Sequence, residues 1–204
     1  MPYTTKPLAC DPKSLDGLSE KLLVSHYENN YGGAVKRLNA IEQALADLDF
    51  ATAPGFLIEG LKREQLIVMN SMILHEVYFA SLGATAMPTP LKEALLRDFG
   101  SIEHWQSEFI AMGKGKGGGS GWVLLTYVAR DARLVNQWSA DHTCGIAGAT
   151  PILALDLYEH SYHIDYGAKA ASYVDAFMRN IDWTAVAHAY AAAAAARAAA
   201  GIAQ

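Results

Sequence analysis

Residues 156–160, Asp-Leu-Tyr-Glu-His, place a carboxylate and an imidazole four positions apart along the chain. Residues at this spacing can converge on one centre in a helix, or where a strand turns into a helix. We expect a short strand near residues 153–157 to lead through a loop into a helix that begins at about Ser172. The spacing predicts that Asp156 and His160 bind the same metal ion.

The first half of the chain is expected to form an antiparallel helical hairpin. Ser19 is suited to cap a helix, and apolar residues then recur at helical spacing over residues 22–45. Gly32 and Gly33 are expected to interrupt this helix, either by bending it or by admitting another backbone. A second helix is predicted over residues 60–82, before the breakers of the AMPTP segment.

Two further histidines lie among apolar neighbours in the middle of these helices. His26 and His75 should both face the interior of the hairpin. A lone buried histidine is more often a core residue than a ligand, but two on facing helices favour a metal site together with residues 156–160. Three imidazoles and one carboxylate suit iron, manganese or zinc. Because no thiolate is present and aromatic residues crowd the segments, we favour a redox metal over structural zinc.

The second half of the chain mixes helices and strands. Residues 91–100 and 102–112 predict two shorter helices, and residues 122–128 and 133–138 predict two strands around a turn. The alanine-rich residues 184–200 predict a terminal helix that frays, because little specifies its packing. The expected fold is therefore α+β. An N-terminal α-helical hairpin domain (1–88) would precede an α/β domain (89–204) with a small three-stranded antiparallel sheet and surrounding helices.

Composition excludes several classes of partner. The chain has 204 residues and a formal net charge of −5, which argues against nucleic acid and against an anionic membrane surface. No apolar run is long enough to span a membrane, and no secretory signal is visible. Cys10 and Cys144 do not make a disulfide framework, so we expect a cytoplasmic protein with reduced thiols.

Other chemical motifs are missing from the sequence. The glycine-rich residues 113–121 do not fit the phosphate-loop pattern and precede a strand instead of a helix, so we interpret them as a flexible connection that permits close backbone approach. The chain has no H-E-x-x-H motif, no paired E-x-x-H motifs and no serine in a nucleophile elbow. His104 and His188 lie in ordinary helical segments and are expected to have no role in chemistry.

Five segments, in order, resemble the iron/manganese superoxide dismutase family. The resemblance extends from about residue 6 to residue 183 and rests on SHYENNYGGAVKRLN (25–39), LHEVYFASL (74–82), GSGW (119–122), DLYEHSYHIDY (156–166) and YVDAFMRNIDW (173–183). It implies one iron ion per subunit, with manganese as the alternative, bound by His26, His75, Asp156, His160 and a solvent molecule. It also implies conversion of superoxide to oxygen and hydrogen peroxide.

The resemblance implies further residues around the metal. Trp122 and Tyr158 would form walls of the pocket, and Phe79 stands where the family often has another tryptophan. The family places a glutamine beside the bound solvent from one of two positions. The first position holds Ser71 here, and the second holds His142, which resembles a variant found in mainly iron-dependent members.

Some family positions are changed in this chain. The gateway tyrosine falls on Ala34, and Tyr31 is the nearest residue that could supply a hydroxyl. The family's histidine–tyrosine pair across the subunit interface becomes Asn30 and His163, which could still exchange a hydrogen bond.

The same resemblance implies an oligomer, and an alternative function stays open. Glu159 is retained where the family reaches across a dimer to the partner's ligand histidine, which predicts a homodimer or a tetramer built from it. The alternative to a superoxide dismutase is a metal-binding homologue with weak or lost activity, serving a structural or other redox role. Ala34 favours the alternative, whereas the complete ligand set favours the enzyme.

Overall fold

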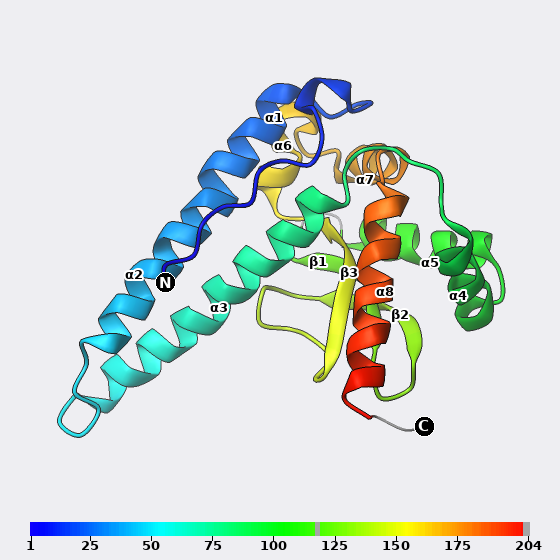
Figure 1. Cartoon of the computed structure of the whole chain (residues 1–204). Coiled ribbons are helices and arrows are strands. Elements are labelled where there is room, and N and C mark those ends of the chain that lie inside the picture. The colour runs from blue at the N-terminus through cyan, green and yellow to red at the C-terminus, as the bar shows by residue number, and fades with distance from the viewer. Residues whose placement is uncertain (117–118, 202–204) are drawn as a thin grey trace.

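A long helical hairpin forms the N-terminal part of the computed structural model, which describes residues 1–116 and 119–201. One arm consists of α1 (Glu20–Ser25), η2 (His26–Tyr31) and α2 (Gly32–Ala46), and the other is α3 (Gly55–Ala80). The two arms lie side by side and antiparallel, as predicted (Figure 1). Ser19 caps α1 by accepting a hydrogen bond from the Leu22 amide, whereas α3 begins five residues earlier than expected.

The irregularity in the first arm lies before the glycines, so the expectation that Gly32 and Gly33 interrupt the helix is wrong. Residues 26–31 form a π-helix, and the two glycines are the first residues of the regular helix α2. A Cβ atom added to Gly33 would meet nothing within 4 Å, so no other backbone approaches it. π-Helical turns are frequent at functional sites, and this one begins at His26.

Three antiparallel strands form the sheet at the centre of the second half. They are β1 (Trp122–Val128), β2 (Arg133–Ser139) and β3 (Ala149–Asp156), in the order β2-β1-β3. The first two match the predicted strands, and the third is longer than expected. β1 and β3 pair so that Trp122 lies opposite Asp156. This register places Trp122, the first residue of β1, beside Asp156, the last residue of β3, at one end of the sheet.

Helices surround the sheet, which confirms the predicted α+β class. After the short η1 (Pro12–Ser14) near the N-terminus, they are α4 (Thr89–Phe99), α5 (Ile102–Gly115), η3 (Glu159–Ser161), α6 (His163–Tyr166), α7 (Ala170–Arg179) and α8 (Trp183–Ala199). The α3 helix contacts β3, while α5 contacts β1 and β2. Within the described ranges, no helix combines the length and apolar character needed to cross a membrane.

The terminal helix α8 is packed, contrary to the expectation that little would specify its position. It lies across the sheet (Figure 1), with Val186 and Ala193 buried. Tyr190 packs against Tyr127 with 5.7 Å between ring centroids, and Arg197 Nε donates a hydrogen bond to the Ala129 carbonyl at 2.7 Å. Small alanines let the helix approach the strands closely, and a few larger side chains fix its register. The last three residues of the chain, 202–204, lie outside the described range.

Gly121, at the end of the glycine-rich run, lies against a neighbouring backbone. Its φ is +124°, and an added Cβ would stand 2.2 Å from the Ser139 carbonyl oxygen and 2.6 Å from that of Ala140. Close backbone approach is therefore confirmed here, and it lets β1 begin directly beside the end of β2. Residues 117–118 of the run lie outside the described residues.

We predict that Gly121→Ala lowers the free energy of unfolding by about 3 kcal/mol or more, since the clash and the unfavourable φ act together. Gly60→Ala is the matched control, because Gly60 lies inside α3 with nothing within 4 Å of an added Cβ. That control should stabilise the protein by about 0.5–1 kcal/mol. Urea unfolding measures both, and equal effects of the two substitutions would contradict the account.

Candidate metal centre

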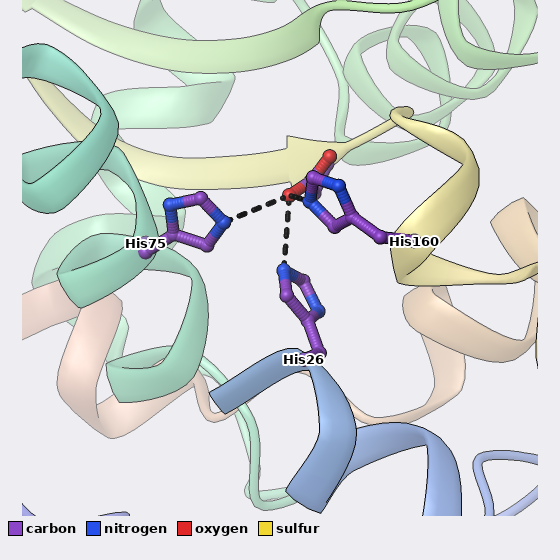
Figure 2. A group of neighbouring side chains, drawn as sticks. His26, His75 and His160 are labelled. Carbon is purple, nitrogen blue, oxygen red and sulfur yellow. Dashed lines mark hydrogen bonds and ion pairs between the residues drawn. The ribbon is translucent and has the colours of Figure 1, made fainter. Parts of the chain in front are cut away.

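Four side chains from four separate segments meet in the interior. His26 comes from η2, His75 from α3, Asp156 from the end of β3 and His160 from η3. Their potential ligand atoms all lie within 4.8 Å of one another. Figure 2 shows the three imidazoles pointing toward a common point from different sides. The residues predicted from spacing and helical pattern are thus brought together by the fold.

The three imidazoles converge on one carboxylate oxygen. The Nε2 atoms of His26 and His160 lie 3.2 Å from Asp156 Oδ2, and that of His75 lies 3.5 Å from it. His26 Nε2 and His75 Nε2 are buried and have no hydrogen-bond partner among the described residues. Burying unpaired polar nitrogens is costly. A cation between these atoms removes that cost, so the donor set fits a metal ion.

Backbone contacts hold Asp156 in position. Its Oδ1 accepts a hydrogen bond from the Tyr158 amide at 2.9 Å, which leaves Oδ2 directed at the imidazoles. The Ser161 hydroxyl donates to the Asp156 carbonyl at 2.9 Å and so joins η3 to the end of β3. Because η3 carries His160, the local fold of residues 156–161 fixes the positions of both Asp156 and His160.

The protonation states suit metal binding. His75 Nδ1–H donates to the Ser71 carbonyl at 2.7 Å, so its Nε2 carries the free lone pair. Burial lowers the pKa of His75 to about 3 and also lowers the pKa of His26. Burial alone would raise the pKa of Asp156, but its contacts with His160 and His26 outweigh this and hold the pKa below its usual range. Neutral imidazoles and an ionised carboxylate are the forms that bind metals.

His142 lies beside these four residues, although it comes from the loop between β2 and β3. The Trp122 indole N–H donates to His142 Nδ1 at 3.1 Å, so in the neutral ring the proton is on Nε2. The Asn70 side chain donates to the His142 carbonyl at 2.7 Å and ties this loop to α3. The His142 ring lies 6.2 Å from that of His75. Burial lowers the pKa of His142 and favours its neutral form.

Aromatic rings line the same region. Tyr158 stacks on His142 and on His160, with centroid separations of 4.8 Å and 5.4 Å. Trp122 packs edge-on against His75 at 5.3 Å, and Phe79 lies 4.9 Å from His26. These rings help to bury His26 and His75 and limit how far the imidazoles can move.

Tyr31 is close to the centre, but its hydroxyl is already engaged. Its ring stacks on that of His75 at 6.4 Å, and the hydroxyl accepts from the Lys6 amide at 2.8 Å and donates to Glu76 at 3.2 Å. Burial raises its pKa to about 12. Ala34 is buried on α2, and nothing at that position supplies a hydroxyl.

The remaining predicted residues lie farther out. Glu159 and His163 are exposed in the single chain, and Asn30 is partly buried. Their expected contacts are with a second subunit, so they stay predictions. His104 and His188 are on the surface.

Three residues around the centre were not predicted from the sequence. Tyr78 lies 5.0 Å from the His26 ring, and its position three residues after His75 on the same helix face was an available signal. Asn70 and Lys6 gave no such signal, because their partners are distant in sequence.

Comparisons with known proteins agree with this geometry. A sequence model of the family described as iron/manganese superoxide dismutases, C-terminal domain, matches residues 87–189. The superoxide dismutase [Fe] of Cupriavidus metallidurans is 68% identical over 194 residues, covering 95% of this chain and 98% of that protein. The chain therefore belongs to the iron/manganese superoxide dismutase family, as the sequence motifs predicted.

More distant relatives include both metal types. The superoxide dismutase [Mn] 1 of Halobacterium salinarum is 34% identical over 190 residues, covering 89% of this chain and 91% of that protein. The superoxide dismutase [Fe] of Aquifex pyrophilus is 32% identical over 184 residues, covering 86% and 85% respectively.

We predict that His142→Leu destabilises the metal-free protein by about 1–3 kcal/mol, because the buried Trp122 N–H loses its acceptor. His142→Gln should cost less, since a glutamine can accept through Oε1 and still donate through Nε2. Urea unfolding of the two variants measures the difference. Equal losses would show that the Trp122–His142 hydrogen bond does not support this wall of the site.

Proposed function

We propose that this protein is an iron superoxide dismutase, which converts two superoxide ions and two protons to one oxygen and one hydrogen peroxide. The iron would be bound by His26, His75, Asp156 and His160. The observation that carries this proposal is the convergence of three imidazoles on Asp156 Oδ2, two of them with buried and unpaired nitrogens. Membership of the family and the high identity to a superoxide dismutase [Fe] support it.

The side chains supply what the reaction needs from the protein. Iron in this site supplies the one-electron acceptor and donor for the two half-reactions, in which one superoxide is oxidised to oxygen and the other is reduced and protonated to hydrogen peroxide. His142 holds a proton on Nε2 beside the centre, because Trp122 occupies its Nδ1. Trp122 and Tyr158 both pack against His142 and so fix the orientation of its ring. The hydrogen bond from His75 to Ser71 keeps Nε2 available as a ligand atom.

Iron is proposed over manganese because of the names and identities of the relatives. The 68% identical relative is named for iron, while the Halobacterium salinarum relative named for manganese is 34% identical. The donors are nitrogen and oxygen atoms of intermediate hardness, which suit both metals, so the donor set alone does not decide between them.

A homodimer is proposed with this function. Glu159 directly precedes His160 and is exposed, and His163 and Ile164, in the same short segment, are exposed as well. The family resemblance, in which the position of Glu159 reaches a second subunit, supports a subunit contact next to the metal centre, and the exposure of these side chains leaves the segment accessible for it. A tetramer built from such dimers would use the same contact. Asn30 is proposed to meet His163 of the second subunit there.

Two further features remain proposals. A cytoplasmic location is supported by the two cysteines, Cys10 and Cys144, which are both free. The division into domains 1–88 and 89–204 is supported by the family's C-terminal domain, whose match begins at residue 87.

We predict that the protein purified without metal and reloaded with iron dismutates superoxide, and that manganese loading gives lower turnover. Inhibition of a superoxide-dependent dye reduction measures the rate, and metal analysis of the same samples gives the occupancy. His160→Ala should lose both the metal and the activity, whereas His188→Ala, on the surface of α8, is the control. Full occupancy with negligible turnover in both metal forms would contradict the proposal and favour a homologue without dismutase activity.

We predict a solution mass of two or four chains at micromolar concentration, measured by light scattering. Glu159→Arg should shift this mass toward one chain, because it reverses a charge in the proposed contact. Lys169→Glu reverses an exposed charge outside the segment 159–164 and serves as its control. A monomeric mass for the unmodified protein would rule out the subunit contact.

A further inference from the structure

The N-terminal arm, residues 3–6, runs along the hairpin between α2 and α3 (Figure 1). Tyr3 is fixed to α2 by two hydrogen bonds, from its amide to Asn39 Oδ1 at 2.8 Å and from Asn39 Nδ2 to its carbonyl at 2.9 Å. Lys6 is fixed to both arms of the hairpin. The arm thus crosses from one helix to the other close to the metal centre.

Both backbone polar groups of Lys6 are bound by tyrosines of η2. The Lys6 amide donates to the Tyr31 hydroxyl at 2.8 Å, and the Tyr27 hydroxyl donates to the Lys6 carbonyl at 2.7 Å. The π-helical turn places the two tyrosine rings together, with 5.5 Å between centroids. One peptide segment is therefore held by two hydroxyls from the turn that begins with His26.

The other side of the same contact belongs to α3. The Lys6 ammonium forms an ion pair with Glu76, and the Tyr31 hydroxyl donates to the same carboxylate at 3.2 Å. Tyr27 directly follows His26, and Glu76 directly follows His75. Tyr27 and Glu76, which follow two candidate ligands in the sequence, therefore both bind Lys6. Lys6 thus joins the two arms of the hairpin next to the metal centre.

We propose that a clamp sets the distance between His26 and His75, and that it is formed by Lys6, Tyr27, Tyr31 and Glu76. These four clamp residues act as positioning residues for the metal. This inference rests on the proposed ligand set. Hydrogen bonds in the surroundings of metal ligands commonly change metal affinity by about 10–100-fold. Aromatic contacts connect the clamp to both histidines. Tyr31 stacks directly on His75. Tyr27 packs against Phe79, and Phe79 contacts His26.

The test compares two ways of loosening the arm. Tyr27→Phe combined with Tyr31→Phe keeps both rings but removes the hydroxyls that bind Lys6. Asn39→Ala removes the two hydrogen bonds at Tyr3 and leaves the Lys6 contacts intact. Each iron-loaded protein is mixed with a chelator to measure the rate of iron loss, and the electron paramagnetic resonance spectrum of its ferric form is recorded.

The double variant should lose iron about tenfold faster than the unmodified protein and show a changed ferric spectrum, while Asn39→Ala should match the unmodified protein in both. Lys6→Ala should move partway toward the double variant, and Lys6→Arg should restore the original behaviour because it retains the ion pair with Glu76. The single variant Tyr27→Phe gives the same comparison if the double variant does not fold.

Unchanged iron release and an unchanged spectrum in the tyrosine variants would overturn the clamp. An equal effect of Asn39→Ala would do so too, because it would show that general loosening of the arm is the cause. Neither result tests the proposed dismutase activity. That activity is tested separately, by the turnover of the unmodified iron-loaded protein.

Discussion

Three imidazole nitrogens directed at one carboxylate oxygen form the constraint on which this structure depends. Asp156 Oδ2 lies 3.2–3.5 Å from the Nε2 atoms of His26, His75 and His160, and Asp156, His26 and His75 are buried. Without a cation, the fold buries an ionised carboxylate and unpaired nitrogens, both of which are costly. With a cation, the same atoms become a complete set of donors. The stability of this interior and its capacity to bind metal therefore have a common physical cause.

The architecture serves to bring four segments to that point. The helical hairpin contributes His26 and His75 from its two arms, and the sheet contributes Asp156 at the end of β3. Pairing of Trp122 with Asp156 across β1 and β3 places the indole beside the centre, and Gly121 permits this by letting β1 start against the end of β2. The short η3 then places His160 next to the Asp156 carboxylate. Each of these positions depends on backbone geometry that a single substitution can disturb.

Much of the fold and the ligand set could be predicted from the sequence, because both rest on local patterns. Helical periodicity, the cap at Ser19 and the strand pattern of residues 122–128 and 133–138 depend mainly on neighbouring residues. The spacing of Asp156 and His160 is local as well. The π-helical turn could not be predicted, because the glycines that follow it are a stronger local signal. The packing of α8 and the contacts of Lys6 could not be predicted either, since their partners lie far away in the sequence.

The most direct test of where the metal binds is anomalous diffraction at the iron absorption edge from crystals of the active, iron-loaded protein. We predict one strong peak per chain, bonded to the Nε2 atoms of His26, His75 and His160 and to a carboxylate oxygen of Asp156. An iron peak elsewhere, or no peak between these four residues in protein that turns over superoxide, would contradict it.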